Sequence, residues 1–255
     1  MRSTLLATAQ CSTLGSKSCL DRCGGAASGD VVIEQILPPE VASAEAFHDP
    51  PEAVLFPAEE EMINRAVDKR RREFRTTRHC ARRALSQLGL PLVPLLRGEH
   101  GQPQWPAGVV GSMTHCVGYR AAAVARSCEI PALGIDAEPH APLPAEVLQT
   151  IAVPEEHQAL IALARSAPQT CWDRVLFCAK EAVYKAWFPL TRRWLGFADV
   201  TITIEPTDRD QGRFQVRLGT PDPAVTAAGT FNRLAGHWLR GADLVITTAV
   251  LSARR

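Results

Sequence analysis

CWDRVLFCAKEAVYKAW, residues 171–187, is the stretch that decides the fold of this 255-residue chain. Apolar side chains recur along it at three- and four-residue steps, which is the spacing of one buried helix face. These side chains are Trp172, Val175, Leu176, Ala179, Ala182 and Val183. Because proline cannot continue a helix, we expect Pro189 to close it. The stretch therefore predicts an amphipathic helix with one face in the core.

One edge of this predicted helix carries charge. At about 100° per residue, Glu181 lies about 40° from Lys185 and about 100° from Lys180. The simplest interpretation is a solvated ion pair, worth a few tenths of a kcal/mol. The bulky aromatic residues around this edge favour another interpretation, in which the acid completes a metal site beside lysines that bind phosphate. Both interpretations remain open from this segment alone.

The rest of the chain contains short segments with β-type alternation or small apolar residues. They are residues 119–125, 133–138, 200–204 and 214–218, and the runs around 237–239 and 244–251, which flank 240–243 like a hairpin. Helices followed by short antiparallel strands, once in each half, predict an α+β fold with two similar lobes.

The first half begins with a segment rich in Ser, Gly and Ala, residues 1–29, which we expect to be a flexible leader. Residues 31–37 read as a strand, and residues 58–88 read as one helix. Acidic residues after Pro57 suit the helix start, because the helix dipole favours negative charge there. Gly89 and Pro91 are expected to end it.

This first helix contains a basic segment, residues 69–83. Four guanidinium groups can share a face opposite the apolar stripe of Phe74, and such a comb suits phosphate binding. They belong to Arg71, Arg75, Arg78 and Arg82. A solvated basic face and a nucleic-acid patch are the alternatives. The second is weakened by a net charge of only +1.

The strand at 133–138 contains two acids. Alternate side chains of a strand share a face, so Asp136 and Glu138 point the same way, about 7 Å apart. Two such carboxylates repel each other unless a cation lies between them, and oxygen ligands suit Mg²⁺. The alternative is an exposed strand with two solvated acids.

Residues 111–115, GSMTH, form another candidate site. Its small residues allow a ligand to approach the backbone closely, and His115 can donate to a phosphate. A single histidine is more often structural, so this signal is weak by itself.

Composition excludes several classes. The chain is 46% hydrophobic and 22% charged, no apolar run approaches the ~20 residues of a membrane helix, and no secretory signal is evident. The eight cysteines include no C-x-x-C pair. We therefore expect a cytoplasmic protein with reduced, buried thiols and neither a membrane nor a nucleic-acid partner.

Taken together, these segments resemble a known family. GIDAEPH (134–140), FCAKEAVYKAWFPL (177–190) and RWLGF (193–197), in this order, are similar to the 4′-phosphopantetheinyl transferases of the enterobactin/surfactin type. RHCAR (78–82) and WPAGVVGSMTHC (105–116) resemble the actinobacterial branch that serves polyketide and non-ribosomal peptide synthetases. The resemblance runs from about residue 32 to residue 251.

The resemblance implies a pseudo-twofold fold, with each lobe built from helices on a small antiparallel sheet. Residues 30–131 would form the first lobe, on the 3′-phosphoadenosine side of coenzyme A, and residues 132–255 the second. Coenzyme A would bind in the cleft between them. Because the internal twofold builds this cleft within one chain, we expect a monomer.

It also implies roles for individual residues. Metal ligands for Mg²⁺, or Mn²⁺, would be Asp136, Glu138 and Glu181. Coenzyme A contacts would be Arg70, Arg78, Arg97, Ser112, His115, Lys180 and Lys185, of which Arg97 replaces a family lysine. The catalytic residues would be Glu181, Lys185 and His115.

The implied activity is that of a holo-[acyl-carrier-protein] synthase. A serine of an apo acyl or peptidyl carrier protein would attack the β-phosphate of coenzyme A and expel 3′,5′-ADP. Glu181 would take the serine proton, directly or through water. A non-catalytic nucleotide- or nucleic-acid-binding protein, built on residues 69–83, is the alternative. A Mg²⁺-dependent kinase or hydrolase is disfavoured because the chain lacks G-x-x-x-x-G-K-[ST] and a kinase-like motif set.

Overall fold

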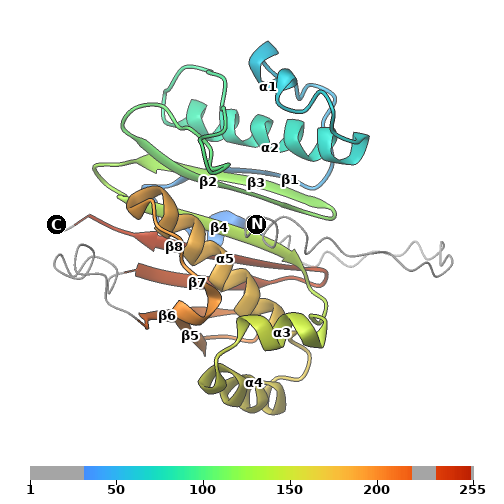
Figure 1. Cartoon of the computed structure of the whole chain (residues 1–255), viewed down its shortest axis with the longest axis vertical. Helices are drawn as coiled ribbons and strands as arrows, with labels where there is room; N and C mark the ends of the chain where they lie inside the picture. The colour runs from blue at the N-terminus through green and yellow to red at the C-terminus, as the bar shows by residue number, and fades with distance from the viewer. Residues whose placement is uncertain (1–31, 220–233, 254–255) are drawn as a thin grey trace, which may run out of the picture. The chain divides into compact units, whose positions relative to one another are not determined.

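The computed structural model describes residues 32–219 and 234–253, and the predicted leader, residues 1–29, lies outside this range. The chain from Val31 to Arg255 forms one compact unit. Within it the strands form two antiparallel sheets, each covered by one 20-residue helix (Figure 1). This arrangement confirms the predicted α+β fold with two lobes.

The first sheet has the order β1-β3-β2. Its strands are β1 (Ala42–Ala46), β2 (Val109–Cys116) and β3 (Tyr119–Arg126). Helix α2 (Asp68–Gln87) packs on β3 and β1, and small side chains such as Ala81, Ala84 and Ala122 allow the close contact. Odd-numbered residues of β2, including Met113, face α2, as expected from strand alternation.

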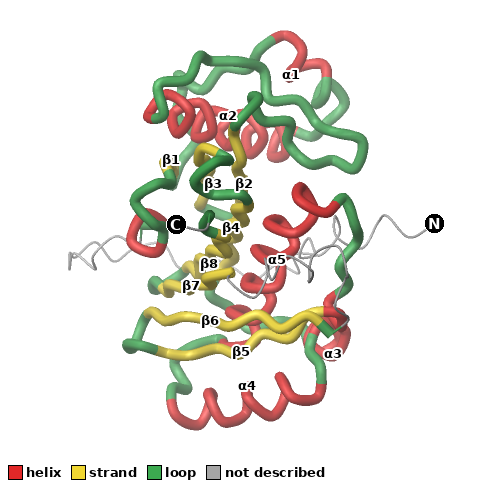
Figure 2. Tube along the Cα trace, turned by 90° about the vertical axis from the view of Figure 1, so that its left-hand side faces the viewer, coloured by secondary structure: helices red, strands yellow, loops and turns green. Residues whose placement is uncertain are grey.

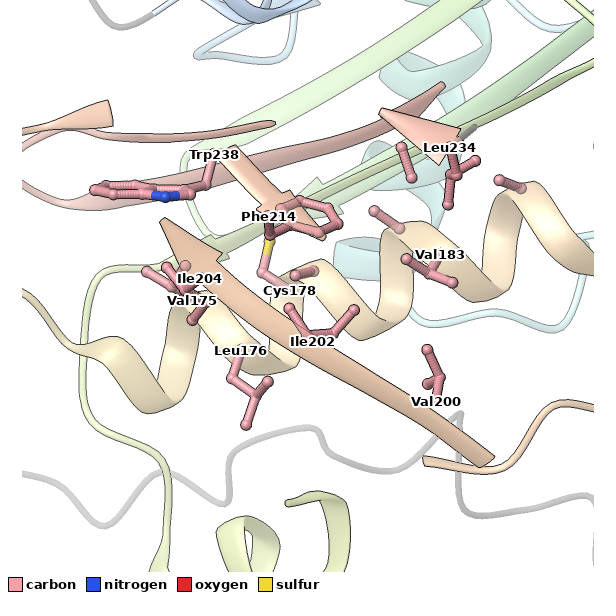
Figure 3. Packing of buried hydrophobic residues seen from close by; sticks show 14 of the residues in the cluster. Val175, Leu176, Cys178, Val183, Val200, Ile202, Ile204, Phe214, Leu234 and Trp238 are labelled. Carbon is pink, nitrogen blue, oxygen red and sulfur yellow. The ribbon is translucent and has the colours of Figure 1, made fainter. Parts of the chain in front are cut away.

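The second sheet has the order β4-β8-β7-β6-β5. Its strands are β4 (Ala132–Pro139), β5 (Val200–Pro206), β6 (Gln211–Leu218), β7 (Leu234–Arg240) and β8 (Leu244–Leu251). Helix α5 (Trp172–Thr191) packs on β4 and β8, and α3 (Ala145–Ile151) and α4 (Pro154–Ser166) lie toward the β5 end (Figure 2). Figure 3 shows its core, in which Val175, Cys178 and Val183 of α5 meet Ile202, Phe214 and Trp238.

The two sheets meet along β2 and β4, which we call the seam. The Ser112 hydroxyl accepts the Ile135 N–H at 3.0 Å, and the Thr114 hydroxyl accepts the Ala137 N–H at 3.1 Å. Side-chain oxygens thus satisfy the outer edge of β4, where an unpaired strand would otherwise expose its N–H groups. A shared apolar core, which includes Tyr119, Ile135 and Ile246, closes the seam from behind.

Gly134 sets the distance between α5 and β4. A Cβ atom at this position would lie 1.9 Å from the Ala182 carbonyl oxygen and 2.7 Å from the Ala186 nitrogen. Only glycine permits this approach of helix backbone to strand. The contact brings the charged edge of α5 against Asp136, two residues further along β4.

Several predicted elements differ from those observed. Residues 58–88 are not one helix: α1 (Pro57–Glu61) and α2 are separate. The reason is Glu59, whose buried carboxylate pairs with Arg82 at 2.9 Å and accepts the Leu95 N–H at 2.8 Å. In a continuous helix Glu59 and Arg82 would be about 35 Å apart, so the chain must turn back.

The predicted strand at 31–37 is also wrong, because Ile33–Ile36 form a 3₁₀ helix, η1. Ile33 and Ile36 are both buried, and a spacing of three suits the 3₁₀ period rather than strand alternation. Pro189 lies inside α5, which ends two residues later where Arg192 adopts a left-handed conformation with φ 57°. The helices α3 and α4, the strands β1 and β2 and the short 3₁₀ helix η2 (Phe197–Asp199) were not predicted.

The cysteine prediction holds in part. Cys80, Cys116, Cys128, Cys171 and Cys178 are all free thiols, and three of them are buried. Cys128 is exposed, because it lies in the turn after β3, and Cys171 is half-buried. The remaining cysteines lie outside the described residues. The predicted lobe boundary at residue 131 stays a prediction, although the change of sheet falls between β3 and β4.

Candidate functional site

The seam carries a group of charged side chains that we call the acid cluster: Asp136, Glu138, Glu181, Lys185 and Arg174. Asp136 is buried, and its Oδ1 accepts hydrogen bonds from Lys185 Nζ at 2.7 Å and from the Thr114 hydroxyl at 3.0 Å. Its Oδ2 is also buried and has no hydrogen-bond partner among the described residues. Oδ2 is therefore the oxygen of Asp136 that neither Lys185 nor Thr114 contacts.

Lys185 connects both sheets to the cluster. Besides Asp136, its ammonium donates to the Ile135 carbonyl of β4 at 3.1 Å and lies 3.5 Å from the Met113 carbonyl of β2. Burial by itself would lower the pKa of Lys185, but the charges of Asp136 and Glu181 outweigh it and raise the pKa. Lys185 is therefore a positive charge at neutral pH.

Glu138 lies one strand period beyond Asp136. Its Oε2 accepts a hydrogen bond from Arg174 Nη1 at 3.1 Å, and Arg174 also donates to the Ala141 and Pro142 carbonyls. Arg174 thus holds Glu138 against the turn that follows β4. Burial, then the charge of Asp136, raises the pKa of Glu138 to about 7.

Glu181 faces the same cluster from α5. Its Oε1 is buried without a hydrogen-bond partner among the described residues. Burial, and after it the negative charge of Asp136, raises the pKa of Glu181 to about 7. Three carboxylates here face two cations, so an added proton or an added cation is electrostatically favourable.

The cluster is not a preassembled metal centre. No group of three or more His, Cys, Asp or Glu side chains in residues 32–219 and 234–253 is arranged to hold a metal ion. The side chains instead turn toward the protein's own cations: Asp136 toward Lys185 and Glu138 toward Arg174. The partnerless oxygens of Asp136 and Glu181 nevertheless suit a hard divalent cation. The three predicted ligands therefore stay a prediction.

Lys180 does not belong to this site. Its ammonium donates to the carbonyls of Ile151, Phe197 and Val200 and pairs with Glu156 at 2.7 Å, with its side chain fully buried. This geometry corrects its prediction as a phosphate contact. Helix geometry explains the outcome, because Lys180 precedes Glu181 by about 100° and points toward β5 and the loop before α4.

A second group of side chains, which we call the basic cluster, lies at the α2 side of the seam: Arg70, Arg78, Arg97 and His115. Arg70 Nη1 lies 2.5 Å from His115 Nε2. Burial, then the charge of Arg70, lowers the pKa of His115 to about 3, so the imidazole is neutral at physiological pH. The charge of Lys185 also lowers the pKa of His115, so the acid cluster and the basic cluster are close enough to interact electrostatically.

Phe74 organises the arginines of this cluster. The Arg78 guanidinium stacks on its ring at 3.6 Å, and Arg97 lies 5.5 Å from the ring centroid. Arg78 is buried, and its Nε has no hydrogen-bond partner among the described residues. Burial lowers the pKa of Arg78 to about 9, so it remains charged at neutral pH. Several positive charges close together, one of them buried, favour an anionic ligand.

Comparison with known protein families agrees with these observations. Residues 58–125 match the 4′-phosphopantetheinyl transferase N-terminal domain, and residues 132–249 match the 4′-phosphopantetheinyl transferase superfamily. The chain is 49% identical to the 4′-phosphopantetheinyl transferase PptT of Mycobacterium tuberculosis, over 83% of this chain and 92% of that protein. The chain belongs to the 4′-phosphopantetheinyl transferase family.

Two further relatives of this transferase are also actinobacterial. It is 46% identical to the 4′-phosphopantetheinyl transferase Svp of Streptomyces mobaraensis, over 87% of this chain and 90% of the relative. It is 48% identical to Npt of Nocardia iowensis, over 87% of this chain and the whole of the relative. The resemblance inferred from the sequence motifs is thereby confirmed.

Two predictions for the transferase can be compared with the structure. Ser112 is buried in the seam, where its hydroxyl accepts the Ile135 N–H, and its predicted contact with coenzyme A stays a prediction. The arginine comb is wrong. Arg82 is buried against Glu59, Arg71 donates to the Asn64 carbonyl, and Arg75 is exposed, so these side chains do not share one phosphate-binding face.

Sequence reasoning missed three residues of the transferase site. Arg174, which holds Glu138, lies seven residues before Glu181 on the same helix, and this spacing could have placed both on one face. Thr114 alternates with Ser112 on β2, so strand periodicity could have paired them. Glu73 lies three residues after Arg70 on α2, a spacing that could have paired them, but its approach to His115 comes from the packing of α2 on β2 and has no local signal.

A cavity of about 610 Å³ opens between the lobes of the transferase, next to the seam. The first lobe lines it with Gly98, Trp105 and Val110, and the second with Leu133, Ala186 and Leu190. Among the described residues, no helix is both long and apolar enough to cross a membrane.

Proposed function

We propose that the chain transfers the 4′-phosphopantetheine arm of coenzyme A to a serine of an apo acyl or peptidyl carrier protein, as a monomer. The observation that carries this proposal is the meeting of the acid cluster and the basic cluster at one seam. Coenzyme A has anionic phosphates at both ends of its nucleotide, and the two clusters suit these two ends. The relatives are 4′-phosphopantetheinyl transferases, which supports the transfer, and we propose carrier proteins of polyketide and non-ribosomal peptide synthesis as the partners.

Asp136, Glu138 and Glu181 would hold Mg²⁺, with Mn²⁺ as a substitute. The fit rests on the buried, partnerless oxygens of Asp136 and Glu181. Glu138 would have to leave Arg174 to join them. The chemistry that a bound Mg²⁺ supplies here is neutralisation of the diphosphate charge.

The chain's own side chains would position the diphosphate and accept the serine proton. Lys185 would shift from Asp136 to the diphosphate and hold it in line with the serine. In the transfer, the serine oxygen forms a bond to the β-phosphorus, and the bond from that phosphorus to the bridging oxygen breaks. The serine proton passes to Glu181, directly or through water, and 3′,5′-ADP leaves.

The basic cluster would bind the 3′-phosphoadenosine end. Arg78 is held in place by Phe74, so little side-chain entropy is lost when its guanidinium meets a phosphate. Arg70 and Arg97 would add charge at the more exposed side. The cavity between the lobes is lined by no residue of either cluster, so the proposal rests on the two clusters and not on the cavity.

The decisive experiment is intact-mass analysis of an apo carrier protein after incubation with the chain, coenzyme A and Mg²⁺. We expect the carrier to gain one phosphopantetheine and 3′,5′-ADP to appear in equal amount. A carrier whose serine is replaced by alanine provides the control and should gain nothing. An unchanged mass of several apo carriers, with the chain folded, would rule the proposal out.

A further inference from the structure

Glu73 of α2 is buried beside the basic cluster and has no function assigned above. Its side chain is 5% exposed. Oε2 has no hydrogen-bond partner among the described residues, yet it lies 3.7 Å from His115 Nδ1 and 3.8 Å from Arg70 Nη1. A buried carboxylate oxygen without a hydrogen bond costs free energy unless a nearby positive charge compensates for the lost solvation.

The Arg70–His115 contact indicates which nitrogen of the imidazole carries the proton. Arg70 can only donate, so at 2.5 Å the His115 Nε2 must be the acceptor. A neutral imidazole then carries its proton on Nδ1, and this is the nitrogen nearest Glu73. The three side chains thus form a series in which Arg70 donates to His115, and His115 presents its N–H to Glu73.

We propose that Glu73 is a positioning residue, which fixes the His115 tautomer and through it the direction of the Arg70 guanidinium. This inference rests on the proposed function. With one N–H of Arg70 directed at His115, its remaining donors are free to meet the 3′-phosphate of coenzyme A. In many sites a carboxylate next to one imidazole nitrogen orients the ring, while the other nitrogen binds the ligand or metal.

Other charges around His115 do not replace this role. Besides Arg70, the cations that act on it are Arg78 on α2, Arg120 on β3 and Lys185 on α5, and all of them disfavour a charged imidazole. In the described part of the chain, Glu73 is the acidic residue whose carboxylate lies within 4 Å of a His115 nitrogen. Its charge offsets the arginines locally and keeps them from repelling Arg70 out of the site.

The first test needs no variant. A long-range ¹H–¹⁵N spectrum of the wild-type chain, labelled at histidine, reports the tautomer of His115, with His115→Gln used to assign the signal. We expect a protonated Nδ1 and an unprotonated Nε2. A protonated Nε2 in the neutral imidazole would overturn the proposal.

The second test measures binding of coenzyme A and of dephospho-coenzyme A, which lacks the 3′-phosphate, by calorimetry. Glu73→Gln keeps the shape and removes the charge, and we expect about tenfold weaker binding of coenzyme A. Binding of dephospho-coenzyme A should change little. Asp68→Asn, the same charge change at the exposed start of α2, is the matched control and should leave both affinities unaltered.

A double variant shows whether Glu73 acts through His115. If it does, Glu73→Gln combined with His115→Gln should bind coenzyme A about as tightly as His115→Gln alone. Additive losses would overturn the proposal, as would wild-type affinity of Glu73→Gln for coenzyme A. Failure of the wild-type chain to bind coenzyme A would instead refute the proposed function itself.

Discussion

The Thr114 hydroxyl of β2 donates to Asp136 Oδ1 of β4 at 3.0 Å, and the Thr114 hydroxyl oxygen accepts the Ala137 N–H at 3.1 Å. One side chain thus both joins the two sheets and orients the first acid of the cluster. Lys185 binds Asp136 Oδ1 as well, so Oδ2 is left for another ligand. The seam between the lobes and the candidate site are therefore one structure.

Replacing Thr114 tests this double role. Thr114→Val keeps the shape but leaves the Ala137 N–H unsatisfied, and we expect a loss of about 1–3 kcal/mol in the free energy of unfolding. Urea denaturation measures it. Thr114→Ser should recover most of the loss, and Thr150→Val, at an exposed hydroxyl on α3, serves as the control. Equal stability of all three variants would show that the hydroxyl does not bind the seam.

Replacing Gly134 tests the contact of α5 with β4. A methyl group there meets the Ala182 carbonyl oxygen at 1.9 Å, so helix and strand must separate. We expect Gly134→Ala to lose about 1–3 kcal/mol of unfolding free energy and to lose transfer activity in the fraction that folds. The control is Gly219→Ala, where the nearest atom lies at 3.5 Å. Comparable melting of the two variants would contradict the close packing.

Lys180 separates structural from ligand-binding roles on α5. Lys180→Met leaves Glu156 buried and unpaired, which should cost about 3–5 kcal/mol in unfolding free energy. Because its ammonium faces carbonyls away from the seam, we expect affinity for coenzyme A to be unchanged in the folded protein. Calorimetric titration at a temperature where the variant is folded decides the matter. A large drop in affinity would restore Lys180 to the phosphate site.

His115 gives a prediction for pH. Its pKa is lowered from 6.5 to about 3, so the folded chain binds fewer protons than the unfolded chain between these values. Its contribution to stability is therefore complete above pH 6.5 and is lost as the pH falls toward 3. His115→Gln lacks this linkage. Unfolding free energy should fall more steeply for wild type than for the variant from pH 7 to pH 5, and parallel curves would refute the lowered pKa.

Glu181 is expected to carry the proton transfer. Glu181→Gln keeps the size of the side chain and removes the base, so turnover should fall by about 10²-fold or more. Coenzyme A should still bind with similar affinity, because the basic cluster is intact. Turnover is followed by carrier-protein mass and binding by calorimetry. Near-normal turnover with coenzyme A bound would assign the base to another group.

Local patterns predicted much of the fold. The three- and four-residue spacing in 171–187 predicted α5, and alternation predicted β4, β5 and β6, because such periods follow from backbone geometry alone. The failures were long-range. Continuous periodicity across 58–88 concealed the turn that brings Glu59 to Arg82, since the pairing of residues 23 apart leaves no local signal.

The candidate site divides in the same way. Asp136, Glu138, Glu181 and Lys185 were predicted from motifs, and the fold brings them together. Motif wording could not show that Lys180, adjacent to Glu181, points to Glu156 instead. It also could not show that the Ser112 hydroxyl accepts a hydrogen bond from the Ile135 N–H.

The amino-acid sequence by itself determined the family, the two-lobe α+β architecture and the residue types available for the chemistry, because these depend on motifs and short-range periodicity. Only the tertiary structure decided which charges face one another. Burial and partners depend on segments far apart in the chain: β2 meets β4 at the seam, α5 approaches Gly134, and Glu73 lies beside His115. Those contacts set which carboxylates stay unpaired, and so where a ligand can be bound.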